Sequence, residues 1–147
     1  MRAFTFTEII DRPPQRVWDV AIDPALAPRW RALVKSMKTE DGGPIRQGSR
    51  LLVAFDVYGT EAVRVAQIDV FEPPHRYTSR SVDQPAIAGE FEFRFEPHGA
   101  GTKVTFTLEL WAKSFLSRLF LPLTARGERR IRAETLGNLK RLVENTP

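Results

Sequence analysis

The sequence contains no cysteine and only two histidines, His75 and His98, among its 147 residues. The absence of cysteine excludes a disulfide scaffold, a thiolate metal site and a cysteine nucleophile. Two histidines are too few for a histidine-rich metal site, and each follows a proline in a predicted turn. We therefore expect no metal and no other cofactor.

Long apolar runs are also missing. The most apolar stretch, Leu116 to Leu123, is broken by Arg118 and Pro122, whereas a membrane span needs roughly 18–20 uninterrupted apolar residues. The N-terminal residues lack the basic leader and apolar run of a signal peptide. With 42% hydrophobic and 27% charged residues, the composition predicts a single cytoplasmic domain over residues 1–147.

The excess of positive over negative charge is confined to one part of the chain. The formal net charge is +4, and residues 113–147 carry eight Lys and Arg against three Glu, while the preceding 112 residues hold fourteen basic and fifteen acidic side chains. These basic residues lack interleaved aromatics and a nucleic-acid motif, so no nucleic-acid partner is expected. The excess favours a weak contact with an anionic membrane surface. The oligomeric state stays open.

Hydrophobic periodicity predicts strands separated by turn residues. Alternation over 3–11 indicates a strand, Pro14 can begin a short helix over 14–21, and a second short helical turn runs through Trp30. Further strands are expected over 34–40, 49–57, 62–71, 76–82, 87–96 and 102–111, with an irregular connection over 83–85. Gly59-Thr60 is predicted to form a two-residue hairpin turn. The short connections favour an antiparallel meander.

The pattern changes to a helical period over 114–145. Ile131, Thr135, Leu139 and Leu142 recur at helical spacing and form one apolar face. Pro122 is predicted to separate a preliminary turn over 115–121 from the main helix. The outward face is expected to carry the basic residues Arg126, Arg129, Arg130, Arg132 and Arg141.

These elements predict an α+β fold. About seven antiparallel strands form a curved sheet, two short helices follow the first strand, and the long C-terminal helix covers the concave face. A curved sheet wrapped around one helix encloses a void, and such voids bind small molecules.

Several local motifs resemble one known family. They are Ile10-Asp11-Arg12-Pro13-Pro14-x-x-Val17-Trp18-Asp19-Val20, Asp23-Pro24, Arg29-Trp30, Phe71-Glu72-Pro73-Pro74, Gly99-Ala100-Gly101-Thr102-Lys103-Val104, Leu119-Phe120-Leu121-Pro122-Leu123 and Leu136-x-x-Leu139-Lys140-x-x-x-Glu144. In this order they resemble the polyketide cyclase/dehydrase-like family of the START/birch-pollen-allergen-like superfamily (SRPBCC), whose fold is the helix-grip. The shared residues are turn and packing positions, so the resemblance is specific for the fold and not for the activity.

The resemblance implies a cavity that binds or transports a hydrophobic small molecule, such as a lipid, an isoprenoid or a polyketide-like aromatic. The alternative that it implies is a cofactor-independent cyclase or dehydratase. A third hypothesis is a protein-interaction module whose void is filled by side chains. No catalytic triad, paired carboxylates or metal motif is evident, so no catalytic residue is assigned.

Side-chain alternation predicts which residues face the cavity. The inward set is Phe55, Arg64, Tyr77, Ser79, Ser81, Phe91, Phe93, Phe95, Phe106 and Leu108 from the sheet, with Ile131 and Thr135 from the helix. The same parity places Val70 inward. An inward Arg64 needs a carboxylate such as Glu8, water or an oxygen-bearing ligand, because an unpaired buried charge is costly. If the predicted register is wrong, Arg64 instead faces solvent.

Overall fold

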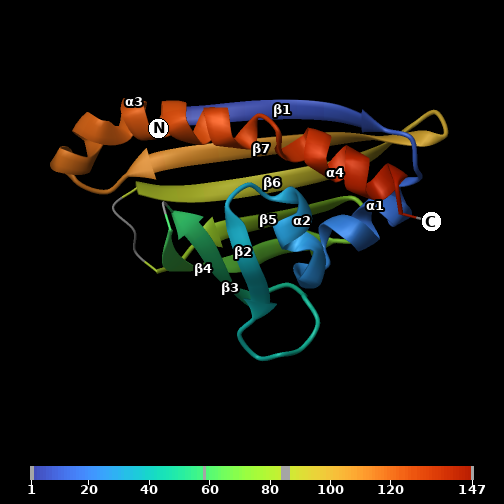
Figure 1. Cartoon of the computed structure of the whole chain (residues 1–147), viewed down its shortest axis with the longest axis horizontal. Coiled ribbons are helices and arrows are strands. Elements are labelled where there is room, and N and C mark those ends of the chain that lie inside the picture. Colours follow the sequence, from blue (N-terminus) through green and yellow to red (C-terminus); the bar gives the residue numbers. More distant parts are fainter. Residues whose placement is uncertain (1, 58, 84–86, 147) are drawn as a thin grey trace.

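A computed structural model describes residues 2–57, 59–83 and 87–146. Residues 84 and 85 of the predicted irregular connection lie outside this described part. The strands are β1 (Arg2–Ile10), β2 (Val34–Thr39), β3 (Arg50–Val57), β4 (Thr60–Glu72), β5 (Arg76–Ser81), β6 (Ile87–His98) and β7 (Gly101–Ala112). They form one antiparallel sheet in the order β1-β7-β6-β5-β4-β3-β2 (Figure 1). The predicted fold class is confirmed.

The short helices lie between β1 and β2. Helix α1 (Pro14–Ala21) starts with a proline, which costs nothing because the first N–H groups of a helix have no helical partner. The 3₁₀ turn η1 (Pro24–Leu26) is capped by Asp23, whose side chain accepts a hydrogen bond from the Ala25 amide. Helix α2 (Ala27–Trp30) follows directly.

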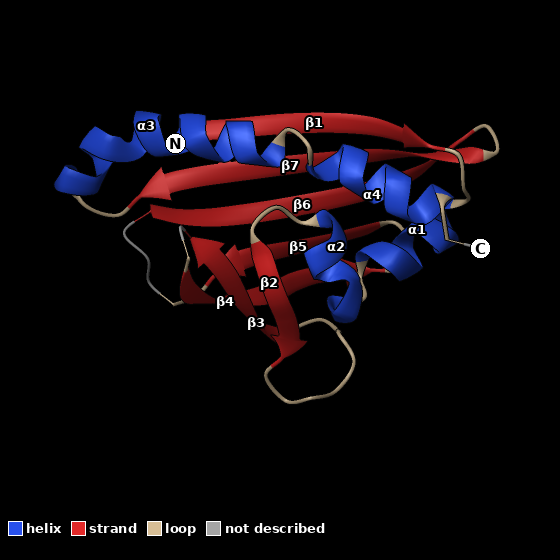
Figure 2. Ribbon diagram, in the orientation of Figure 1, coloured by secondary structure: helices blue, strands red, loops and turns tan. Residues whose placement is uncertain are grey.

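The C-terminal helical region consists of two segments, α3 (Phe115–Arg132) and α4 (Thr135–Glu144). Ser114 and Ser117 form a reciprocal capping box at the start of α3. The predicted boundary at Pro122 is wrong, because Pro122 lies inside α3 and the break falls at residues 133–134. Figure 2 shows α3 and α4 running in line along the β1–β7 side of the sheet, with α1 and α2 at one end. None of the helices in the described residues is both long enough and apolar enough to cross a bilayer.

The β3–β4 hairpin keeps the predicted parity with a shifted loop. Val57 pairs with Thr60, so Thr60 is the first residue of β4 and not part of the predicted Gly59-Thr60 turn. A turn at Gly59-Thr60 would pair Phe55 with Arg64, whereas Phe55 pairs with Ala62, two residues earlier on β4, and Arg64 pairs with Val53. A shift of two leaves the same side chains on the same face.

A β-bulge changes the parity further along β4. The β4–β5 register shifts between Ile68 and Val70, so that Val70 pairs with Thr78 and Phe71 pairs with Tyr77. Phe71 therefore points to the inner face and contacts Trp18 of α1. The prediction that Val70 faces inward is wrong, because an extra residue in one strand reverses the alternation beyond it.

Aromatic side chains fill the core where α1 and α2 pack on the sheet. Trp18 meets Tyr77 and Phe95 edge-on, at centroid distances of 5.7 and 5.6 Å. Phe93 stacks on Phe106 at 4.5 Å. These rings are nearly inaccessible to solvent. Together they fill this end of the concave face.

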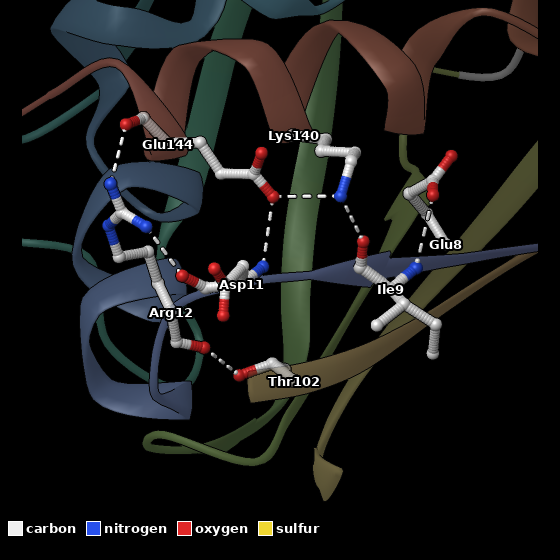
Figure 3. A network of polar contacts seen from close by, with 7 residues as sticks. All are labelled: Glu8, Ile9, Asp11, Arg12, Thr102, Lys140 and Glu144. Carbon is white, nitrogen blue, oxygen red and sulfur yellow. Dashed lines mark hydrogen bonds and ion pairs between the residues drawn. The ribbon is translucent and has the colours of Figure 1, made fainter. Parts of the chain in front are cut away.

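A polar network ties the end of α4 to the end of β1 (Figure 3). Glu144 Oε2 accepts hydrogen bonds from the Asp11 amide at 2.9 Å and from Lys140 Nζ at 2.8 Å. Lys140 Nζ also donates to the Ile9 carbonyl, and Arg12 donates to the Glu144 carbonyl, both at 2.6 Å. The network fixes α4 over the end of the sheet that the aromatic core fills.

Candidate functional site

A cavity of about 440 Å³ lies between the concave face of the sheet and the second half of α3. Its volume falls within the roughly 300–1,000 Å³ that is usual for small-molecule sites. Strands β3 and β4 form one wall, and the segment that follows α2 forms another. The apolar lining comprises Ala32, Leu33, Val34, Met37, Leu51, Val53, Phe55, Ala62, Val65, Ala66, Ile87, Phe91, Leu110 and Ile131.

Half of the predicted cavity residues lie on this wall. They are Phe55, Arg64, Ser79, Ser81, Phe91 and Ile131. The two serines introduce polar atoms among the apolar side chains, and the Ser81 hydroxyl donates to the Gly89 carbonyl at 3.3 Å. Strand alternation thus brings together side chains from β3, β4, β5 and β6 around one space.

The other predicted residues lie in the packed core instead. Tyr77, Phe93, Phe95, Phe106, Leu108 and Thr135 are all nearly inaccessible and do not line the cavity. The five residues on strands share the inner face with the lining residues, and Thr135 begins α4. Trp18 and Trp30 occupy the space in front of the rings, with Trp30 5.7 Å from Phe93. Strand alternation predicts on which face of the sheet a side chain lies, but it does not predict whether a helix packs over that side chain.

Arg64 lies on the cavity wall with 57% of its side chain exposed. Its nearest described carboxylate is Asp83, with Nη1 and Oδ2 separated by 3.9 Å. Glu8, the partner considered from the sequence, instead accepts a hydrogen bond from the Ile9 amide. Because its guanidinium is largely hydrated, Arg64 does not incur the desolvation cost of a buried charge.

Arg132 is buried on the cavity side of α3, contrary to the prediction that it lies on the outward face. Its Nε donates to Glu128 Oε2 at 3.1 Å, and its guanidinium lies 5.1 Å from the centre of the Phe91 ring. Glu128 also lines the cavity. The one-turn spacing of Glu128 and Arg132 compensates both charges, which allows them to face inward.

Arg31 occupies the cavity wall directly after α2. Its Nη2 donates to the Tyr77 hydroxyl at 2.6 Å, and its guanidinium lies 4.7 Å from the Trp30 ring centre and 5.4 Å from that of Phe93. Its Nε is buried without a hydrogen-bond partner in the described part of the chain. None of the described carboxylates forms an ion pair with it. The guanidinium of Arg31 is thus fixed in position, but no carboxylate in the described residues neutralises its charge.

The Tyr77 hydroxyl is a neutral partner for Arg31. Burial raises the pKa of the Tyr77 phenol above its ordinary value, and the nearby Arg31 charge offsets only part of this effect. The phenol therefore stays protonated at neutral pH and positions the guanidinium without neutralising it.

Sequence reasoning missed Arg31, Glu128 and Arg132. Arg29 and Arg31 flank Trp30 in the sequence, and nothing local distinguishes the exposed Arg29 from the lining Arg31. For Arg132, the four-residue spacing from Glu128 was an available signal, since such pairs form on one helix face.

The whole architecture has a counterpart among known families. The model of the family described as "Polyketide cyclase / dehydrase and lipid transport" matches residues 1–144. The chain belongs to this family. The family resemblance inferred from the sequence motifs is thereby confirmed. Membership supports binding of a hydrophobic ligand or cyclase activity in general.

Solved structures with the same fold share little sequence. The protein TTHA0849 from Thermus thermophilus is 21% identical with a TM-score of 0.75, and the alignment covers 97% of each chain. A START superfamily protein from Mycobacterium smegmatis is 15% identical with a TM-score of 0.68, again over 97% of each chain. At these identities the similarity establishes the fold alone.

A third similar structure is a didomain protein. The ARO/CYC protein BexL from the BE-7585A biosynthetic pathway is 22% identical with a TM-score of 0.73. The alignment covers 99% of this chain and 51% of BexL, so this chain spans about half of that protein. No curated protein matches the sequence significantly.

Proposed function

We propose that the cavity binds a hydrophobic small molecule whose acidic end pairs with Arg31. The observation that carries the proposal is an apolar cavity of about 440 Å³ with an uncompensated guanidinium on its wall. Family membership supports the apolar part of this assignment. A lipid, isoprenoid or polyketide-like molecule with a carboxylate or an acidic enol has the required chemistry.

The charges on the wall favour an anionic group. Three arginines line the cavity, Arg31, Arg64 and Arg132, against one carboxylate, Glu128. Arg132 is paired with Glu128, and Arg64 lies near Asp83 and solvent. Arg31 is therefore the position at which an anion would gain most, because a charge-assisted hydrogen bond is worth about 1.5–3 kcal/mol.

Binding is better supported than cyclisation or a protein-interaction role. A cyclase needs groups that move protons, but Glu128 is held by Arg132 and the Tyr77 hydroxyl is held by Arg31. An interaction module with a filled void would not retain a space of this volume. Binding of a hydrophobic molecule with an acidic end accounts for both the apolar wall and the inward Arg31.

The test compares three ligands that share the same alkyl chain and differ in their terminal group. Dodecanoic acid, methyl dodecanoate and dodecan-1-ol would compete with the fluorescent probe N-phenylnaphthylamine, at a pH where the acid is ionised. We expect the acid to bind roughly ten-fold or more tightly than the alcohol or ester. Arg31→Gln should remove this preference and leave alcohol binding unchanged. Arg29→Gln removes the same charge from an exposed position of α2 and should preserve the preference.

Two different results would overturn two parts of the proposal. If none of the three compounds displaces the probe, or if filling the cavity with Ala62→Phe leaves their binding unchanged, the cavity is not the binding site. If all three bind equally well to the unmodified protein, a hydrophobic ligand remains supported and the role of Arg31 is wrong.

A further inference from the structure

We propose that the first half of α3 docks on the surface of an anionic lipid bilayer. Five large apolar side chains there, Phe115, Leu116, Leu119, Phe120 and Leu123, are 56–76% exposed. Their spacing places them on one face of the helix, which we call the apolar stripe. Contiguous exposure of this kind marks an interaction surface, whereas single exposed apolar residues need no explanation.

The opposite side of α3 is the side that packs against the sheet. Ser117, Leu121, Ala125 and Arg132 are its buried residues, and they lie on the side that packs toward β7 and β1. Figure 1 shows the start of α3 projecting beyond the ends of β6 and β7. The apolar stripe is therefore available to a partner without any rearrangement of the core.

The charges around the stripe identify the partner. Arg126 and Arg130 continue the same helix face beyond Leu123, and Lys113, Arg118 and Arg129 are also exposed. In residues 113–132 the single acidic side chain is Glu128, which faces the cavity and pairs with Arg132. The exposed charges of this segment are thus all positive. Apolar side chains flanked by arginine and lysine suit a helix lying in the headgroup region of anionic lipids.

A second copy of the chain fits this surface less well. A two-fold contact places the same patch of both copies face to face. Such a contact through the stripe would bring Arg126 and Arg130 of each copy close to their counterparts, without acidic residues on the patch to compensate. An anionic bilayer matches the apolar and the basic parts of the surface together.

The proposal also links the surface to the cavity. Glu128, Ile131 and Arg132 of α3 form part of the cavity wall, and the stripe ends at Leu123, little more than one helical turn earlier. Docking through α3 would bring the cavity wall next to the bilayer, from which an apolar ligand could transfer. The docking itself does not depend on the identity of that ligand.

The test is flotation of the protein with vesicles of phosphatidylcholine alone or mixed with phosphatidylglycerol. We expect the mixed vesicles to bind at least ten-fold more protein at low salt, and added salt to weaken this binding. The triple variant Leu116→Ser, Leu119→Ser, Leu123→Ser should lose binding to the mixed vesicles. The double variant Arg126→Gln, Arg130→Gln should weaken it roughly ten-fold or more.

A matched control changes exposed apolar residues elsewhere. Ile9→Ser with Val63→Ser replaces two exposed side chains on strands and should leave flotation unchanged. Circular dichroism verifies that each variant is folded. Equal binding to both vesicle types, or undiminished binding of the triple variant, would refute the proposal. Sedimentation velocity that shows a dimer, converted to monomer by the triple variant, would assign the stripe to self-association instead.

Discussion

Gly101, at the start of β7, lies against the backbone of Ile10 at the end of β1. A Cβ at this position would be 2.5 Å from the Ile10 carbonyl oxygen, whereas a Cβ at Gly127 in α3 would meet nothing within 4 Å. Both are glycines in regular elements, but only the first is required by its surroundings.

We predict opposite effects of alanine at these two positions. Gly101→Ala should destabilise the protein by about 1–3 kcal/mol, because backbone must move to admit the methyl group. Gly127→Ala should stabilise it by about 0.5–1 kcal/mol, because alanine restricts the unfolded chain and has the higher helix propensity. Urea unfolding measures both changes. A neutral Gly101→Ala would show that the Ile10 backbone can yield.

At the level of elements, the pairing of β6 with β7 contains an unfavourable charge contact. Glu90 lies directly opposite Glu109. Partial burial raises the pKa of Glu90 above its ordinary value, and the Glu109 charge adds to this effect. The folded protein therefore holds the Glu90 proton more tightly than the unfolded chain, and stability is lost as the pH rises through the raised pKa.

Glu90→Gln should accordingly raise the Tm at neutral pH. The gain should disappear at acidic pH, below the ordinary carboxyl range, where the glutamate is itself neutral in both states. Glu96→Gln on the same strand is the control, because Glu96 faces Lys103 and should gain nothing. Thermal unfolding followed by circular dichroism at several pH values measures the difference. A gain that is independent of pH would contradict the electrostatic explanation.

At the level of the whole molecule, Glu144 at the end of α4 connects the C-terminal helix to the residue that follows β1. The hydrogen bond from the Asp11 amide and the contact with Lys140 lower the pKa of the Glu144 carboxyl below its ordinary value. The lowered pKa means that the ionised form stabilises the folded state above the ordinary carboxyl pKa. This stabilisation is lost as the pH falls through the lowered value.

Glu144→Gln should therefore lower the Tm at neutral pH, and the deficit should shrink as the pH falls. Glu40→Gln, at an exposed position after β2, makes the same charge change without these contacts and serves as the control. Calorimetric scans across the acidic range measure the two variants. An equal loss in both would indicate a general effect of net charge rather than the connection between β1 and α4.

The sequence by itself determined the elements and their order. Alternating apolar residues, together with proline and glycine at the turns, placed all seven strands within a few residues of their observed bounds. Apolar periodicity placed the C-terminal helical region, and the turn and packing motifs pointed to the family. These features are encoded locally, because side-chain alternation and turn chemistry depend on neighbours in the chain.

Only the tertiary structure decided which inward side chains line open space. The core residues Phe93 and Phe106 share the inner face with the lining residues Phe55 and Phe91, and Phe91 even contacts Phe106 at a centroid distance of 5.7 Å. Trp30 covers Phe93, whereas the rings of Phe55 and Phe91 border the cavity. The bulge in β4, the continuation of α3 through Pro122 and the inward Arg132 likewise escaped prediction. The inward position of Arg31 depends on contacts with Tyr77 and Phe93, far away in the sequence. Packing between distant segments sets these features, and no local pattern contains that information.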